Sequence, residues 1–425
     1  MIQQFLRCGL VLLLLAACNL STTAAPNTNE QQPDTTSAGA FSAYLYSPQR
    51  GDLLLLNADG TSTRYNLGLP ADTYTYSSNM SFSDDGRLVA YCTIAYVPNS
   101  PVSTATLYVR DIAAQSNLLT LDLGSNEGKF CSVGKHSLVG NQLALSLMNY
   151  APYSANPDTS QPVWEVRIID FTTGELVSKI SSDLYPLDDL SAQYGGMMTL
   201  PSVLRYTGTD VLLAFFPFAS EGLLNAPSFI WNVASGSLNT IADWGRSGMD
   251  VLDTGELVYP DNEPGLPAGT PMGPMGVFNV LRAVDDGGQP RIIYHAADWL
   301  IGSARFINHG RQLALALFPS YNPDTPDASS GIRWIALDRS GSVTELFSSP
   351  YFAEVLPAPD GYLVLIQNYE NGNPQQGSFS LTLVSGGVST VLWQDANAGD
   401  ASWELAWASP TEIASDLPPF PTFTP

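Results

Sequence analysis

Short apolar segments separated by polar turns recur along this chain, and the clearest copy is SFSDDGRLVAY, from Ser81 to Tyr91. It predicts a strand, a tight Asp-Asp-Gly turn and a second strand, because Gly and Asp tolerate positive φ or bond their own backbone. Weaker copies lie at residues 130–147, 202–216, 249–260, 303–318 and 353–367. Each copy is followed by two more strands around a turn, so the repeating unit is a meander of four antiparallel strands.

The spacing of this unit predicts the fold. First strands begin near Met80, Lys129, Val203, Met249, Ser303 and Ala353. A period of roughly 40 to 50 residues with four strands per unit is typical of propeller blades. Residues 41–67 supply three further strands and residues 402–408 supply one. We therefore predict an all-β, seven-bladed β-propeller over residues 41–410, closed by pairing of the C-terminal and N-terminal strands, which removes open sheet edges.

The segment SFSDDGRLVAY, followed by TLYVRD at Thr106–Asp111, resembles the propeller repeat of TolB-like proteins and of prolyl-oligopeptidase-family enzymes, and the repeat is WD-repeat-like in length. The resemblance extends over most of residues 41–410 and is best in the first complete unit. It implies a propeller fold. Because that fold hosts scaffolds, binding proteins and enzymes, the resemblance implies no particular activity.

The N-terminal 40 residues are typical of an export signal followed by a tether. Arg7 precedes a short apolar run, and Leu15-Ala16-Ala17-Cys18 matches the lipobox of a bacterial lipoprotein. The apolar run is too short to span a bilayer comfortably. We expect cleavage of the signal peptide (1–17), lipidation of Cys18, a flexible tether over 18–40, and anchoring on the outer side of the cytoplasmic membrane, or in the periplasm or outer membrane if the cell has one. The Pro-rich residues 411–425 are expected to form a disordered tail.

Charge and cysteine content agree with export. The chain has 17 Lys and Arg against 40 Asp and Glu, a formal net charge of -23. Such a surface repels nucleic acid, although we favour solubility as the reason for the acidic composition. Cys92 and Cys131 fall in facing strands of neighbouring units. They would pair in an oxidising compartment if their Cα atoms lie within about 7 Å. The other interpretation is two buried thiols, and the sequence leaves both open.

The connections between the second and third strands of each unit are long, and we expect them to share one face of the ring. Loops on a rigid scaffold often carry binding sites, and aromatic rings supply large contact area at low entropic cost. Aromatic residues that end second strands also fit simple packing between blades, which we favour for them. The ligand-binding candidates on this face are Tyr96, Tyr150, Tyr153, Tyr185, Tyr194, Phe218, Tyr259, Tyr321 and Tyr369.

Residues that carry catalytic chemistry are sparse. The three histidines are scattered: His136 and His309 are predicted in turns on the opposite, plain face, and His295 after an outer strand. This spacing argues against a His-based metal site or a Ser-His-Asp triad, and no GxSxG, HExxH or P-loop motif occurs. Two acidic pairs, Asp188 with Asp189 and Asp324 with Asp327, fit solvated loops better than a Ca²⁺ site.

We therefore expect a monomer without a cofactor that acts as a binding or scaffold module for an envelope protein or a glycan. It would contact the membrane only through its lipid and would not bind nucleic acid. The alternative is a carbohydrate-active enzyme, a glycoside hydrolase or lyase on the same propeller. An enzyme would bring two carboxylates, or an acid with an Arg or Tyr, within about 10 Å of one another at the channel mouth.

Overall fold

The computed structural model is an all-β structure. It describes residues 41–70, 73–75, 80–96, 100, 102–127, 129–149, 163–182, 198–218, 226–245, 249–252, 254–261, 278–284, 289–297, 299–319, 331–359, 361–369, 377–395, 403–410 and 412–423. Within these residues no helix is both long and apolar enough to cross a bilayer.

Both ends of the described chain contribute strands to one sheet. Its order is β29 (Glu404–Ala408), β1 (Ser42–Ser47), β2 (Asp52–Asn57) and β3 (Ser62–Asn66). β1 pairs antiparallel with β29, with Tyr44 opposite Trp407 and Tyr46 opposite Glu404. The C-terminal strand is thus hydrogen-bonded to the N-terminal one, as the leftover segments at 41–67 and 402–408 predict.

The remaining sheets follow along the chain. The next contains β4 (Thr73–Tyr74), β5 (Met80–Phe82), β6 (Leu88–Tyr96), β7 (Val102–Asp111) and β8 (Ser116–Glu127). An eight-stranded sheet contains two four-stranded meanders: β9 (Lys129–Val139), β10 (Gln142–Asn149), β11 (Val163–Asp170) and β12 (Glu175–Ser181), then β13 (Met198–Tyr206), β14 (Asp210–Phe218), β15 (Ala226–Asn232) and β16 (Leu238–Gly245). The two meanders are joined by a parallel bridge between β9 and β13.

Three four-stranded antiparallel sheets complete the domain. The first is β17 (Asp250–Val251), β18 (Leu257–Asp261), β19 (Val280–Val284) and β20 (Arg291–His295). The second is β21 (Trp299–Ile307), β22 (Gln312–Pro319), β23 (Ile332–Asp338) and β24 (Val343–Ser349). The third is β25 (Phe352–Ala358), β26 (Gly361–Tyr369), β27 (Gly377–Ser385) and β28 (Val388–Asp395).

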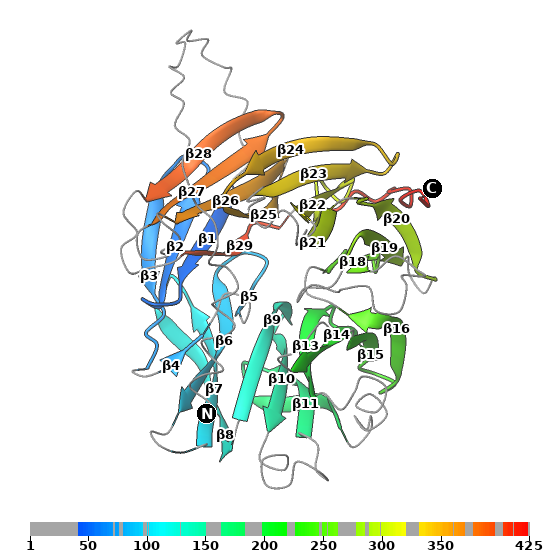
Figure 1. Ribbon diagram of the computed structural model, residues 1–425. Helices are drawn as coiled ribbons and strands as arrows, with labels where there is room; N and C mark the ends of the chain where they lie inside the picture. The colour runs from blue at the N-terminus through cyan, green and yellow to red at the C-terminus, as the bar shows by residue number, and fades with distance from the viewer. Residues whose placement is uncertain are drawn as a thin grey trace.

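The sheets radiate from a common centre (Figure 1). The innermost strands follow one another around it in chain order, and they are β5, β9, β13, β17, β21, β25 and β29. Apolar clusters fill the space between neighbouring sheets, because the strands are buried on both faces. This radial arrangement of four-stranded antiparallel sheets is a β-propeller domain.

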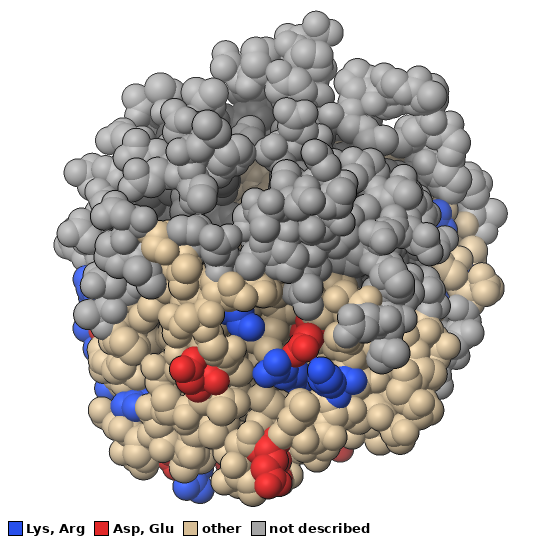
Figure 2. All heavy atoms as spheres, turned by 90° about the horizontal axis from the view of Figure 1, so that it is seen from below, with Lys and Arg blue, Asp and Glu red and all other residues tan. Residues whose placement is uncertain are grey.

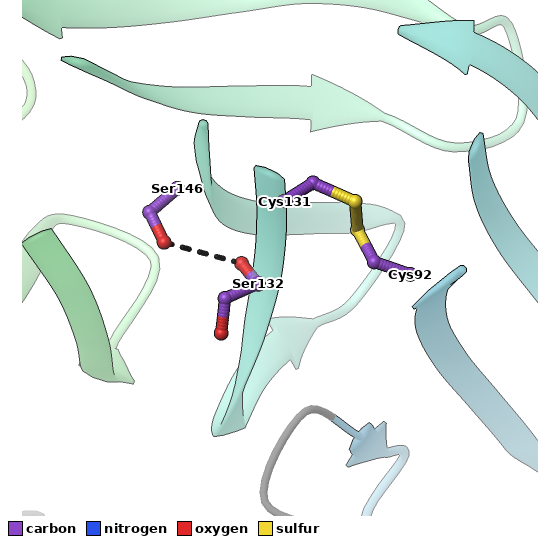
Figure 3. Close-up of a disulfide and its surroundings, with 4 residues drawn as sticks. All are labelled: Cys92, Cys131, Ser132 and Ser146. Atoms are coloured by element: carbon purple, nitrogen blue, oxygen red, sulfur yellow. Dashed lines mark hydrogen bonds between the residues drawn. A yellow bond between two sulfur atoms is a disulfide. The ribbon is translucent and has the colours of Figure 1, made fainter. Parts of the chain in front are cut away.

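A disulfide joins two neighbouring sheets. Cys92 in β6 and Cys131 in β9 are bonded, with their Cα atoms 5.9 Å apart (Figure 3). Both residues are buried in one apolar cluster. Of the two interpretations that the sequence leaves open, the structure has the disulfide.

The Pro-rich tail corrects a prediction. The sequence suggests disorder after residue 410, but residues 412–423 pack against the sheets of β17–β20 and β21–β24, and the chain ends beside β20 (Figure 1). Phe420 is 1% exposed, and Arg339 lies over its ring at 4.4 Å. Its carbonyl accepts a hydrogen bond from Arg291 Nη2 at 3.1 Å. The apolar side chains between the prolines bury enough surface to order the segment.

Candidate functional site

The centre of the propeller contains a cavity of about 610 Å³. Its lining includes a residue from each innermost strand or from the turn that follows it, for example Phe82, His136, Arg205, Asp250, Arg305, Pro357 and Trp407. Many of these residues lie at the C-terminal ends of the inner strands, next to the turns that join the first and second strands of each meander. The cavity is therefore at the end of the channel opposite the one at which the second strands end and the third strands begin.

A bulge in β9 carries two polar residues into this cavity. Leu138 pairs with Leu143 and Val133 with Leu145, so residues 134–137 of β9 face Ala144 alone. Residues of a bulge do not pair in the hydrogen-bond ladder, and their side chains point in directions that a regular strand does not allow. Here Lys135 and His136 line the cavity.

The neighbouring sheets hold the bulge in place. Ser81 Oγ of β5, which is fully buried, accepts hydrogen bonds from the amides of Ser137 and Leu138, both at 2.9 Å. On the other side, a Cβ at Gly134 would lie 1.7 Å from the carbonyl oxygen of Val203, so only glycine permits this approach of β9 to β13.

Two arginines enter the cavity from β13 and β21. Arg205 pairs in register with His136 across the parallel bridge, next to a one-residue bulge at Leu204. Its Nη1 donates to the Val251 carbonyl at 2.8 Å, and Arg305 Nη1 donates to the Met249 carbonyl at 3.0 Å. The two guanidinium groups are therefore held by the carbonyls of the residues that precede and follow Asp250.

Asp250 is a structural link between β17 and β21. Its Oδ2 accepts the amide of Phe306 at 2.8 Å and its Oδ1 accepts the amide of Val251 at 3.0 Å. Burial raises the pKa of Asp250, while Arg305 and the two amide donors act in the opposite direction. The carboxylate is thus satisfied by backbone donors.

His136 is exposed to the cavity yet surrounded by protein and cations. Desolvation, followed by the charges of Arg205, Lys135 and Arg305, lowers the pKa of His136 to about 3. The imidazole is neutral at physiological pH and has a nitrogen available as a donor or an acceptor, depending on its tautomer. Beside it, Lys135 Nζ lies 3.7 Å from Glu354 Oε1, a contact that joins β9 to β25 across the central space.

The placement of the histidines corrects the sequence prediction. His136 lies within β9 rather than in a turn, and His136 and His309 line the same cavity although the sequence separates them. His309 Nδ1 contacts the Glu412 carbonyl of the tail at 2.7 Å. The sequence carries only a weak signal for this site, a Gly-Lys-His run inside an otherwise apolar strand. The convergence of the two arginines has no local signal.

The aromatic residues predicted to bind a ligand differ in their exposure. Tyr259 is 1% exposed and packs in an apolar cluster with Leu212 and Leu257. Its side chain is not available to a ligand, so the prediction of Tyr259 as a ligand-binding residue is wrong. Tyr96 is 42% exposed at the end of β6. Phe218 and Tyr369 end β14 and β26, but their side chains lie outside the described part. Candidates wholly outside the described residues are Cys18, Tyr150, Tyr153, Tyr185, Tyr194 and Tyr321, together with the acidic pairs at 188–189 and 324–327.

The charged surface gives no large patch of one sign on the face seen in Figure 2. There the described residues show acidic and basic side chains in small separate groups among uncharged ones.

Within the described ranges, no group of three His, Cys, Asp or Glu residues is placed to hold a metal ion. An acid beside an arginine at the channel mouth is one arrangement expected of an enzyme, and Asp250 lies beside two arginines. Both of its carboxylate oxygens, however, already accept hydrogen bonds from backbone amides.

Comparisons with known proteins return similarity of structure only. No protein-family model matches the chain, and no curated protein matches its sequence. The β-propeller domain of the trilobed protease from Pyrococcus furiosus is similar at 11% identity and a TM-score of 0.48, over 81% of this chain and 87% of that one. Acylaminoacyl peptidase from Pyrococcus horikoshii is similar at 12% identity and a TM-score of 0.48, over 83% and 52% of the two chains.

TolB from Acinetobacter baumannii is similar at 13% identity and a TM-score of 0.38, over 86% of this chain and 66% of that one. The chain spans about half the length of the acylaminoacyl peptidases that it matches. The β-propeller assignment rests on the strand pairing of this chain, and these similarities add no residue to the site.

Proposed function

We propose that this protein is a lipid-anchored, extracytoplasmic binding module built on a seven-bladed propeller. The pairing of β29 with β1 supports a closed ring, since it completes the N-terminal sheet with the C-terminal strand. The lipobox at Cys18 and the disulfide between Cys92 and Cys131 both support export, because disulfides persist in oxidising compartments.

One observation carries the binding role. The longest stretches between second and third strands are residues 150–162, 262–279 and 320–331, and the second strands that precede them, β10, β18 and β22, all end on the same side of the sheets. The turns at the other end are short, such as the one between β9 and β10. A rigid ring whose long connections begin and end on one side is suited to hold a protein partner or a glycan there.

A pulldown from solubilised envelope, run beside a glycan array, tests this function. Alanine at Tyr153, Tyr185 or Tyr321 should weaken capture by roughly 1 to 2 kcal/mol each if these residues are hot spots. Matched changes in the short turns of the other face, Arg87→Ala and Glu175→Ala, should leave capture unchanged. Loss of capture by the turn variants alone would place the binding surface on the other face.

Anchoring is tested separately. Replacing Cys18 with Ser removes the thiol that would be lipidated, so the protein should leave the membrane fraction or remain unprocessed. Normal maturation and unchanged fractionation of the variant would contradict the lipid anchor, whatever the result of the pulldown.

A further inference from the structure

The central cavity has features of a built site for a ligand beyond the partner proposed above. Its polar lining depends on a four-residue bulge in β9, on the buried hydroxyl of Ser81 that satisfies the bulge, and on the close approach permitted by Gly134. A regular β9 would pair with β10 along its whole length, and only every second side chain would face the cavity. The bulge gives up ladder hydrogen bonds to present Lys135 and His136 as consecutive residues.

The charge of the cavity lining differs from that of the chain. The chain carries a formal net charge of -23, yet Lys135, Arg205 and Arg305 line the same 610 Å³ space. The carboxylates of the lining are Asp250, which is held by backbone amides, and Asp84, which is exposed after β5. Glu354 faces Lys135. The guanidinium groups are fixed through contacts to the carbonyls of Met249 and Val251, which orients them before a ligand arrives.

We propose that this cavity binds an oxyanion, a phosphate or carboxylate group, on Lys135, His136 and the guanidinium groups of Arg205 and Arg305. Guanidinium groups match the geometry of such anions with paired N–H donors. A neutral imidazole adds one more donor. Because the site lies at the turn end of the channel, it is distinct from the surface proposed for the envelope partner and does not depend on it.

Binding and the protonation of His136 are coupled. The groups that face His136 are Lys135 on β9, Arg205, Arg305, Asp250 and Asp84, with Glu354 beyond Lys135. Desolvation, and after it the charges of the cations, hold the pKa of His136 low. A bound anion offsets part of that positive charge, so the pKa of His136 should rise on binding. By linkage, affinity for the anion should increase as pH falls through the raised pKa.

The experiment uses the full chain labelled with ¹³C at its histidines, so that the signals of His136, His295 and His309 are followed separately. Inorganic phosphate, at ionic strength held constant with chloride, should shift the His136 signal to saturation in the millimolar range. His295 lies outside the cavity lining and serves as the internal reference. A His136 signal that ignores phosphate, or that follows chloride equally, would overturn phosphate binding here.

A second arm uses a short peptide with a free C-terminal carboxylate and the same peptide with a C-terminal amide. Binding of the carboxylate form but not the amide assigns the oxyanion to a peptide end; binding of phosphate alone assigns it to a phosphate. Failure of both probes rejects the proposal.

Variants locate the site. Arg305→Gln should weaken the binding of whichever probe binds by about tenfold, the effect of one charge-assisted hydrogen bond. Arg311→Gln removes the same charge from an exposed turn residue outside the lining and should change affinity less than twofold. If Arg305→Gln does not fold, Lys135→Gln takes its place, since that side chain is only partly buried and the variant keeps the His136 signal. Equal effects of the cavity variant and the Arg311 variant would contradict the site.

Discussion

At the scale of single residues, the turns between third and fourth strands repeat one device. Asp59, Asp170 and Asp338 each accept hydrogen bonds from a hydroxyl and a backbone amide two residues on, at Thr61, Thr172 and Ser340. Asp111 accepts the amide of Ala114 and Arg87 Nε. These bonds lower the pKa of all four carboxyl groups. Such Asp turns are favoured because the side chain replaces a missing backbone partner.

The lowered pKa values predict acid sensitivity. A carboxyl group whose pKa is lower in the folded than in the unfolded protein stabilises the fold above its unfolded pKa, about 3.9 for Asp, and this stabilisation is lost as pH falls through the folded pKa. The triple variant with Asn at 59, 170 and 338 keeps an accepting oxygen but does not titrate. Its unfolding free energy, from urea unfolding, should fall less steeply than that of the wild type between about pH 5 and 3. Parallel pH profiles would contradict the prediction.

At the scale of elements, the C-terminal tail docks around one fully buried ring. Phe420 inserts into the apolar cluster that joins the sheets of β17–β20 and β21–β24, and it lies 6.5 Å from Phe306, ring centroid to ring centroid. Arg339, which lies over its ring, is paired with Glu256 at 2.6 Å, and both side chains are nearly buried. Phe420 and the arginine that covers it therefore form the buried centre of the docked tail, beside the partly buried Ile413 and Leu417.

Two phenylalanines of the tail make a matched test. Phe420→Ala removes a buried ring, a change that costs about 3 kcal/mol or more in a core, limited here to the free energy of docking the tail. Phe423 is 37% exposed, so Phe423→Ala should change stability little. We expect a lower thermal midpoint and faster amide exchange in residues 412–423 for the first variant only. Equal behaviour of both would mean that Phe420 does not anchor the tail.

The disulfide is the covalent link between two sheets. It closes a loop with a sequence separation of 39 residues, and the chain-entropy model assigns about 4 kcal/mol to a loop of that length. The double variant Cys92→Ser, Cys131→Ser should lower the unfolding free energy by roughly 2 to 4 kcal/mol in denaturant unfolding. A reducing agent should lower the stability of the wild type toward that of the variant and leave the variant itself unaffected.

At the scale of the whole molecule, the first and last strands of the described chain meet in one sheet. Tyr44 of β1, Phe82 of β5 and Trp407 of β29 pack together, and a Cβ at Gly86 would lie 2.7 Å from the Trp407 ring. β29 is thus fixed both by backbone pairing to β1 and by contacts to the next sheet along the chain.

Two truncations separate the role of β29 from that of the tail. Ending the chain before residue 402 removes both, exposes the edge of β1 and should broaden and lower the unfolding transition. Ending it after Pro410 removes only the tail and should have a smaller effect. If both truncated forms unfold at the same midpoint, β29 adds nothing and the closure proposed here is wrong.

The strands, the turns and the pairing of the two ends follow from the sequence itself. Alternation of apolar segments with Gly- and Asp-containing turns is a local property, since it depends on the φ and ψ preferences of a few neighbouring residues. That is why first strands near Met80 and Lys129 were predictable, and why the lone segment at 402–408 pointed to the three strands at 41–67.

The central cavity and the docked tail were decided only by tertiary structure. His136 and Arg305 are far apart in the chain, and they line one cavity because the inner strands of the sheets converge on a common centre. The β9 bulge that exposes Lys135 depends on Ser81 of another sheet, and the order of the tail depends on a cleft between two sheets that receives Phe420. Each of these contacts joins residues that no local pattern relates, because the free energy that fixes them comes from packing between sheets.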